Sequence, residues 1–166
     1  MITAASLANV PLFKGLTLKQ LEAILSVVKE RNWMAGDTIL KEGNEEDSMY
    51  ILLSGVVEVS KRMTLRMPGQ EEELQKSLVR IDASEPSVFG EMAMLNGSQR
   101  SATVTVVKAC QTLEISRLDL ERLCAADPSM GAQLFRNLTQ ILDKRLRGAN
   151  QDIVKLATAL VLALGK

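Results

Sequence analysis

The chain has 166 residues, enough for one domain with a sizeable core, and 46% of them are hydrophobic, as expected of a folded globular protein. Lysine and arginine together number 20, and so do aspartate and glutamate. This balance argues against nonspecific nucleic-acid binding, which depends on neutralising many phosphates. Histidine is absent, which excludes Ser-His-Asp catalysis, Cys-His pairs, histidine metal sites and imidazole proton transfer.

The cysteines and the two ends of the sequence indicate a cytoplasmic protein. Cys110 and Cys124 form neither a CxxC motif nor a secreted disulfide framework, so we interpret them as small buried residues in a reducing compartment. Residues 1–16 lack the basic region and long apolar core of a signal peptide. The apolar tail at 153–165 is interrupted by Lys155 and is shorter than the roughly 20 residues that span a bilayer. We expect no membrane partner.

The first predicted element is an amphipathic helix that begins after Thr17, whose side chain is placed to cap it. We assign residues 1–29 to an N-terminal helical segment. The apolar residues that recur at helical spacing are Leu18, Leu21, Ile24, Leu25 and Val28.

From Glu30 onward, short apolar runs punctuated by glycine predict strands joined by tight turns, as in an all-β sandwich or barrel. A polar stretch follows, in which residues 71–81 form a strand of an exposed hairpin with Pro68-Gly69 at its tip. Residues 102–116 alternate well enough for two further half-buried strands.

Helical spacing returns at Ser116, a predicted cap for a helix that ends before Pro128. A last helix is predicted from about Ser129, with a break at Gly148-Ala149-Asn150 and with Phe135 in the core. Its apolar stripe consists of Met130, Leu134, Leu138, Ile141, Leu142 and Leu146.

The run FGEMAMLNGSQRSATV, residues 89–104, holds one carboxylate and one guanidinium nine residues apart among small and apolar residues. Gly90 permits close backbone approach, and Glu91 can accept hydrogen bonds from sugar hydroxyls. Arg100 offers a fork that suits phosphate, beside the hydroxyl of Ser101. From the residue types alone, a ligand pocket and a surface ion pair between Glu91 and Arg100 are equally supported.

The same run resembles the phosphate-binding cassette of the cyclic nucleotide-binding domain family, which shares an F-G-E-(L/M)-A-(L/M)…R-(A/S/T)-A-T-V pattern. That family includes bacterial catabolite-activator-like regulators, regulatory subunits of cAMP-dependent kinase and cyclic-nucleotide-gated channels. Residues 35–59 are similar to its glycine-punctuated strands, and residues 116–128 to its first C-terminal helix. The resemblance covers roughly residues 12–146.

The resemblance implies an α+β, mainly β fold: a β-roll or jelly-roll barrel of about eight antiparallel strands with an N-terminal helix and C-terminal helices. We assign the β-roll to residues 30–116, with its cassette at 89–104, and the C-terminal lid or dimerisation helices to 117–166. Because no room is left for a winged helix before Lys166, we expect no DNA binding by this chain. The chain is either a piece of a larger protein or a stand-alone sensor.

The resemblance also implies the ligand and the role of each cassette residue. Glu91 would accept from the ribose 2′-hydroxyl, and Arg100 would hold the cyclic phosphate with help from Ser101 and the Ala93 N–H. Gln99 departs from the proline often found before the arginine. Ser101 resembles the bacterial cAMP regulators, so we expect cAMP rather than cGMP. The implied ligand-binding set is Phe89, Gly90, Glu91, Met92, Ala93, Arg100, Ser101 and Ala102.

Contacts with the base come mostly from the final helix in this family. The polar candidates there are Asn137, Lys144, Arg147 and Asn150. Of these, we predict Arg147 and Asn150 as the base contacts. A position on the solvated helix face or at a dimer rim is the simpler explanation for each of these side chains.

In the family the nucleotide is a switch that moves the C-terminal helices and not a substrate, so we predict a regulatory protein with no catalytic residues, metal or cofactor. The apolar last helix predicts a homodimer. A degenerate member that serves only as a dimerisation or interaction module is the alternative. A cupin-like enzyme is excluded because cupin metal centres need histidines.

Overall fold

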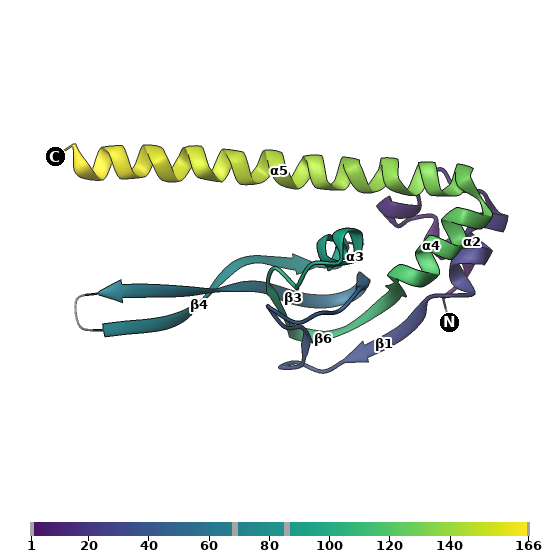
Figure 1. Cartoon of the computed structure of the whole chain (residues 1–166), viewed down its shortest axis with the longest axis horizontal. Coiled ribbons are helices and arrows are strands. Elements are labelled where there is room, and N and C mark those ends of the chain that lie inside the picture. The colour runs from purple at the N-terminus through teal and green to yellow at the C-terminus, as the bar shows by residue number, and fades with distance from the viewer. Residues whose placement is uncertain (1, 68–69, 85–86, 166) are drawn as a thin grey trace.

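A computed structural model describes residues 2–67, 70–84 and 87–165, and within them no side chain between 64 and 73. A β-barrel is flanked by N-terminal helices and covered by one long C-terminal helix (Figure 1). The strands are β1 (Lys29–Trp33), β2 (Thr38–Leu40), β3 (Ser48–Met67), β4 (Gln70–Asp82), β5 (Ser87–Phe89) and β6 (Thr103–Ser116). The helices are α1 (Ala4–Leu7), η1 (Pro11–Phe13), α2 (Leu18–Leu25), α3 (Glu91–Asn96), α4 (Arg117–Ala126) and α5 (Pro128–Leu164).

All strand pairs in the sheet are antiparallel, in the order β1-β6-β3-β4, with β2 on β6 and β5 on β3. The jelly-roll prediction is confirmed, although the described residues form six strands where we expected about eight. One reason is that β6 runs unbroken through residues 103–116, where two strands were predicted. No glycine or proline interrupts that segment, so nothing local turns the chain.

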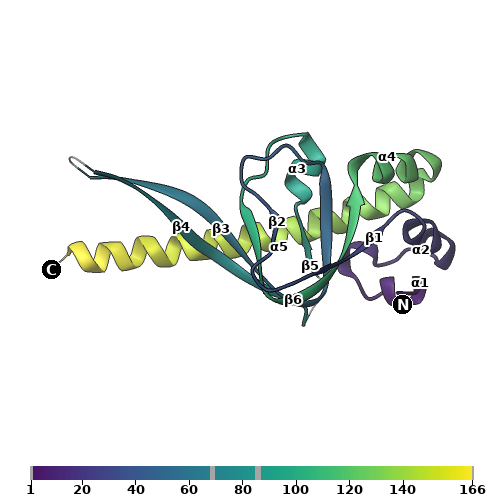
Figure 2. The ribbon, with the colours of Figure 1, turned by 90° about the horizontal axis from the view of Figure 1, so that it is seen from below.

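The β3–β4 hairpin projects well beyond the barrel (Figures 1 and 2). Its register runs from the pair Val56–Asp82 to the pair Met67–Gln70, with an irregularity after Val59. The predicted strand at 71–81 is therefore confirmed as part of β4. The predicted tip, Pro68-Gly69, lies outside the described residues.

Alternation along β3 divides the hydrophobic core in two, because successive side chains of a strand point to opposite faces. Tyr50 and Leu52 point into the barrel, where they pack with residues such as Phe89. Met49 and Ile51 point to the other side and pack against the helices. The strand that carries the barrel therefore also anchors the helical layer.

Helices α2 and α4 begin at the caps that the sequence predicted, and α5 begins within one residue of its predicted start. The Thr17 side chain accepts from the Gln20 N–H at the start of α2, and the Ser116 side chain accepts from the Asp119 N–H at the start of α4. Asp127 caps α5 by accepting from the Met130 N–H at 3.0 Å. These are local signals, so the sequence identifies them without tertiary information.

Two predictions about the last helix were wrong. α5 is continuous over 37 residues and has no break at 148–150, because a single internal glycine costs only about 1 kcal/mol relative to alanine. Phe135 is 47% exposed and is not a core residue. It follows Leu134 by one position, a rotation of about 100° around the helix, which carries it from the buried face to the flank.

Candidate functional site

The cassette is a short turn of helix between two strands, and Gly90 makes it possible. Gly90 joins β5 to α3 with a φ of 80°, a left-handed conformation that side chains other than glycine rarely adopt. A β-carbon there would lie 3.0 Å from Arg100 Nη1 and 3.1 Å from a methyl carbon of Leu40. Backbone angle and space both require glycine at this position.

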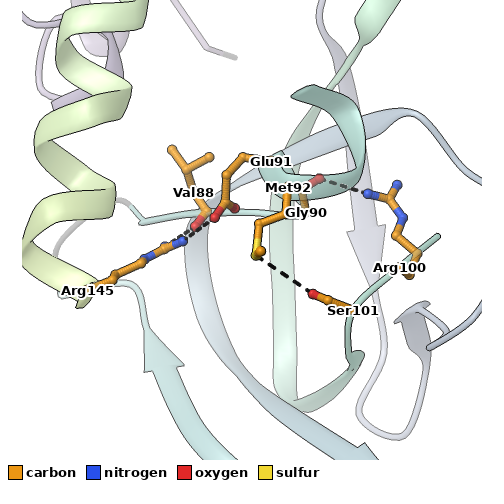
Figure 3. Close-up of polar contacts among 7 residues, drawn as sticks. All are labelled: Val88, Gly90, Glu91, Met92, Arg100, Ser101 and Arg145. Atoms are coloured by element: carbon orange, nitrogen blue, oxygen red, sulfur yellow. Dashed lines mark hydrogen bonds and ion pairs between the residues drawn. The ribbon is translucent and has the colours of Figure 1, made fainter. Parts of the chain in front are cut away.

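Arg100 lies inside the protein with part of its hydrogen-bonding capacity unused. The residue is 3% exposed, and its Nη1 donates to the Gly90 carbonyl oxygen at 2.9 Å (Figure 3). Nε and Nη2 are buried and have no hydrogen-bond partner among the described residues, although Nε lies 3.5 Å from Glu46 Oε2. Buried polar atoms without partners are rare and costly, so this pair of nitrogens marks a place for an acceptor.

Glu91 is also buried, at 4% exposure, and it is held by a residue from the far end of the chain. Arg145 of α5 donates from Nη1 to Glu91 Oε1 at 2.9 Å, and its Nη2 donates to the Val88 carbonyl oxygen. Figure 3 shows this guanidinium reaching from α5 to the base of the cassette. The contact joins the predicted ribose-binding carboxylate directly to the long helix.

Glu91 and Arg100 therefore do not form the surface ion pair that their residue types left open. Each is buried, and the two face different partners: Arg145 for the carboxylate, Gly90 and Glu46 for the guanidinium. A charge that is removed from water without full compensation is unfavourable for folding alone. The unpartnered nitrogens of Arg100 are better suited to binding a polar ligand than to stabilising the barrel.

The remaining cassette residues surround these two charges. Phe89 is buried and stacks on Tyr50, with ring centroids 5.6 Å apart, while Ala93 is buried in the first turn of α3. The exposed Ser101 hydroxyl lies 3.9 Å from the Met92 sulfur as a weak donor. Ala102 is half-buried. The sequence-predicted set is thus brought together at one end of the barrel.

Burial raises the pKa values of one phenol and two thiols in this protein. Burial, with a smaller contribution from the carboxylates of Glu114 and Glu46, raises the pKa of Tyr50 to about 12. Burial also raises the pKa of the Cys110 and Cys124 thiols, so both stay protonated and unreactive near neutral pH. Cys110 is buried as the sequence predicted, whereas Cys124 is only half-buried.

The candidate base contacts lie farther along α5. Arg147 pairs with Asp143 one turn away at 2.8 Å, and Asn150 is exposed. Within the described part of the chain, neither side chain forms a hydrogen bond or ion pair with a cassette residue. Asn137 has a structural role instead, because its Nδ2 donates to the carbonyl oxygens of Leu12 and Lys14, both at 2.8 Å. Arg147 and Asn150 stay predictions for a ligand-bound state.

Sequence reasoning missed Arg145 and Glu46. Both are separated from their partners by more than 50 positions, Arg145 from Glu91 and Glu46 from Arg100, so no spacing rule connects them. A weak signal existed for Arg145, because it is a cation within the apolar stripe that continues from Leu142 to Leu146.

Two other kinds of site were also sought in residues 2–67, 70–84 and 87–165. No cluster of three or more acidic or cysteine side chains suited to a metal occurs there. Within the same ranges, no helix combines the length and the apolar character needed to cross a membrane.

Comparison with known proteins agrees with this geometry. The sequence profile of the family described as "Cyclic nucleotide-binding domain" matches residues 30–127, more than half of the chain. A cyclic nucleotide-gated potassium channel of Mesorhizobium japonicum is 30% identical over 130 residues, which cover 78% of this chain and 32% of the channel.

Solved structures of similar fold also include cyclic nucleotide-binding proteins. The Thermus thermophilus catabolite activator protein is 27% identical with a TM-score of 0.68, over 89% of this chain and 63% of that one. The regulatory domain of Toxoplasma gondii PKA, solved with cAMP, is 28% identical with a TM-score of 0.58, over 72% of this chain and 42% of that one. This chain spans less than two thirds of each of these relatives. It belongs to the cyclic nucleotide-binding domain family.

Proposed function

We propose that this chain is a sensor that binds a cyclic mononucleotide, cAMP in preference to cGMP, between the cassette and α5. The single observation that carries the proposal is the pair of buried Arg100 nitrogens without hydrogen-bond partners. A cyclic phosphate supplies the missing acceptors and a countercharge. Charge-assisted bonds of this kind are each worth about 1.5–3 kcal/mol.

The neighbouring groups complete the proposed site. The hydroxyl of Ser101 and the backbone N–H of Ala93 donate further hydrogen bonds to the phosphate. The Ala93 N–H is free to do so because it lies in the first turn of α3, where an N–H has no acceptor within the helix. Glu91 accepts from the ribose 2′-hydroxyl, since one carboxylate has room for several hydrogen bonds. The preference for cAMP rests on Ser101, which resembles the bacterial cAMP regulators. Phe89, Met92 and Ala102 line the cassette around these contacts.

The same contacts offer a route by which ligand binding moves α5. Arg145 and the ribose both bind to Glu91, so a nucleotide that enters the site alters the ion pair between Glu91 and α5. A ligand shifts a conformational equilibrium by its differential affinity for the two arrangements. We infer that the position of α5 over the barrel, and with it any base contact from Arg147 or Asn150, changes when the site fills.

We further propose that the distal half of α5 pairs with the same helix of a second copy. All residues from 149 to 165 are exposed, although many are large and apolar. Their spacing alternates between four and three residues, which is the heptad pattern of a coiled coil. The seven positions in this seam are Leu142, Leu146, Ala149, Ile153, Leu156, Leu160 and Ala163.

A degenerate, non-binding family member is the alternative, and the intact Glu91–Arg100 geometry favours a binding site over it. A cytoplasmic location, the absence of enzymatic activity and the absence of DNA and membrane partners stay predictions from the sequence.

Calorimetric titration of the chain with cAMP, cGMP and linear 5′-AMP tests the proposal. We expect micromolar binding of cAMP, weaker binding of cGMP and much weaker binding of 5′-AMP, whose dianionic, open phosphate does not match the site. Absence of both heat and thermal stabilisation at millimolar cAMP and cGMP would leave the degenerate alternative as the explanation.

A further inference from the structure

The loop between β2 and β3, residues 41–47, brings a second carboxylate to Arg100. Two backbone hydrogen bonds of 2.9 Å hold this loop in place: the Gly43 N–H donates to the Arg100 carbonyl, and the Arg100 N–H donates to the Asn44 carbonyl. Glu46 Oε2 then lies 3.5 Å from Arg100 Nε. The contact is an ion pair and not a hydrogen bond, since Nε has no hydrogen-bond partner.

The two side chains of this pair differ in their freedom to move. The Arg100 side chain is 2% exposed, whereas that of Glu46 is 43% exposed. Arg100 is also fixed by its bond to the Gly90 carbonyl. Glu46 can therefore turn out into water, while the guanidinium stays where it is. Without a ligand, the Glu46 carboxylate offsets the positive charge of Arg100, whose burial would otherwise be unfavourable for folding.

Taking the proposed function as given, we propose that Glu46 sets the affinity and the charge selectivity of the site by competing with anionic ligands for Arg100. A phosphate that approaches Nε must displace the Glu46 carboxylate or lie beside it, and either event opposes binding of an anion. An uncharged ligand is not repelled by the Glu46 carboxylate. Glu46 thus acts as an internal competitor that keeps the site empty until the nucleotide concentration rises.

Calorimetry on three proteins tests this role: the wild-type chain, Glu46→Gln and the control Glu45→Gln. Glu46→Gln keeps the shape of the side chain and removes its charge. Glu45 is exposed and forms no hydrogen bond or ion pair with the described residues, so its variant reports the effect of net charge alone. The ligands are cAMP, which is anionic, and adenosine, which is neutral.

We expect Glu46→Gln to bind cAMP about fivefold more tightly than the wild-type chain, the effect of removing one partly exposed charge interaction. Adenosine binding should be unchanged within about twofold, or undetectable in both, and Glu45→Gln should match the wild-type chain. The proposal is overturned by an unchanged cAMP affinity in Glu46→Gln, by an equal gain for adenosine, or by an equal gain in Glu45→Gln.

Inorganic phosphate separates this test from the proposed function. We expect phosphate to raise the melting temperature of Glu46→Gln more than that of the wild-type chain, because the competitor of the anion is gone. If no variant binds cAMP or cGMP, the proposed function fails, and the phosphate experiment still decides the role of Glu46. Equal stabilisation of the two proteins by phosphate would count against that role.

Discussion

Glu91 and Arg145 are separated by 54 positions in the sequence and by 2.9 Å in the structure. The carboxylate lies at the start of α3 and is buried, whereas the guanidinium extends from α5 with 40% of its side chain exposed. The pair is therefore both a stabilising contact of the barrel and the point at which the cassette meets the long helix.

Replacing Arg145 with glutamine should weaken the fold, because it leaves the Glu91 carboxylate buried without its cation. Breaking a fully buried pair costs roughly 3–5 kcal/mol. Since Arg145 is partly exposed, we expect a loss of about 1–2 kcal/mol in the free energy of unfolding, measured by urea denaturation. The control is Arg147→Gln, which removes an exposed pair with Asp143 and should cost less than about 0.5 kcal/mol. Equal losses in the two variants would show that Glu91 does not depend on Arg145.

Arg100→Leu should weaken cAMP binding at least about tenfold, because the loss of one charge-assisted hydrogen bond lowers the binding free energy by this amount. The variant should stay folded. Folding survives because two guanidinium nitrogens already lack partners and leucine removes a costly buried charge. Calorimetry measures the affinity, and thermal unfolding verifies the fold. Arg62→Leu, at an exposed arginine paired with Glu42, should bind cAMP as the wild-type chain does. Unchanged affinity in Arg100→Leu would place the phosphate elsewhere.

Leu156→Lys should convert a dimer to a monomer, since it places a charge in the middle of the proposed α5 seam. Light scattering after size-exclusion chromatography measures the molecular mass in solution. Thr158→Lys adds the same charge two positions away, outside the seven-residue seam, and should stay dimeric. A monomeric wild-type chain, or monomers from both variants, would argue against pairing through this face.

The Tyr50 hydroxyl should ionise only in strongly alkaline solution. Burial raises its pKa to about 12, whereas an unfolded chain has a tyrosine pKa of about 10. The contribution of the neutral phenol to stability is thus fully present below pH 10 and is lost between pH 10 and 12. Because Tyr50 is the only tyrosine, the absorbance of tyrosinate reports it alone. We expect a midpoint near 12 in the native protein and near 10 in urea; a native midpoint near 10 would mean that the ring is accessible to water.

The sequence predicted those parts of the fold that local chemistry specifies. Thr17 and Ser116 are recognisable caps, and Gly90 stands where the backbone needs a left-handed residue. The cassette residues were found together because they are neighbours in the chain. Their roles came from the family resemblance, since residue types alone fitted a surface ion pair equally well.

What the sequence could not supply depends on tertiary packing. The partners of Glu91 and Arg100 come from α5 and from the loop before β3, and no periodicity connects such distant segments. The break predicted at Gly148 failed because the weak local preference of one glycine is outweighed by the helix on both sides of it. Phe135 was misplaced because the spacing of apolar residues does not separate the centre of a buried helix face from its edge.

Because α5 is long and unbroken, a small rotation near Arg145 would produce a larger displacement at its far end. At 1.5 Å per residue, the helix extends about 28 Å from Arg145 to Leu164. If Arg145 is the pivot, a tilt of only about 10° there would carry the far end through about 5 Å, by the geometry of a rigid rod of this length. If ligand binding tilts α5 at the Glu91–Arg145 contact, the displacement at Leu164 would therefore be several times larger than the displacement at the carboxylate.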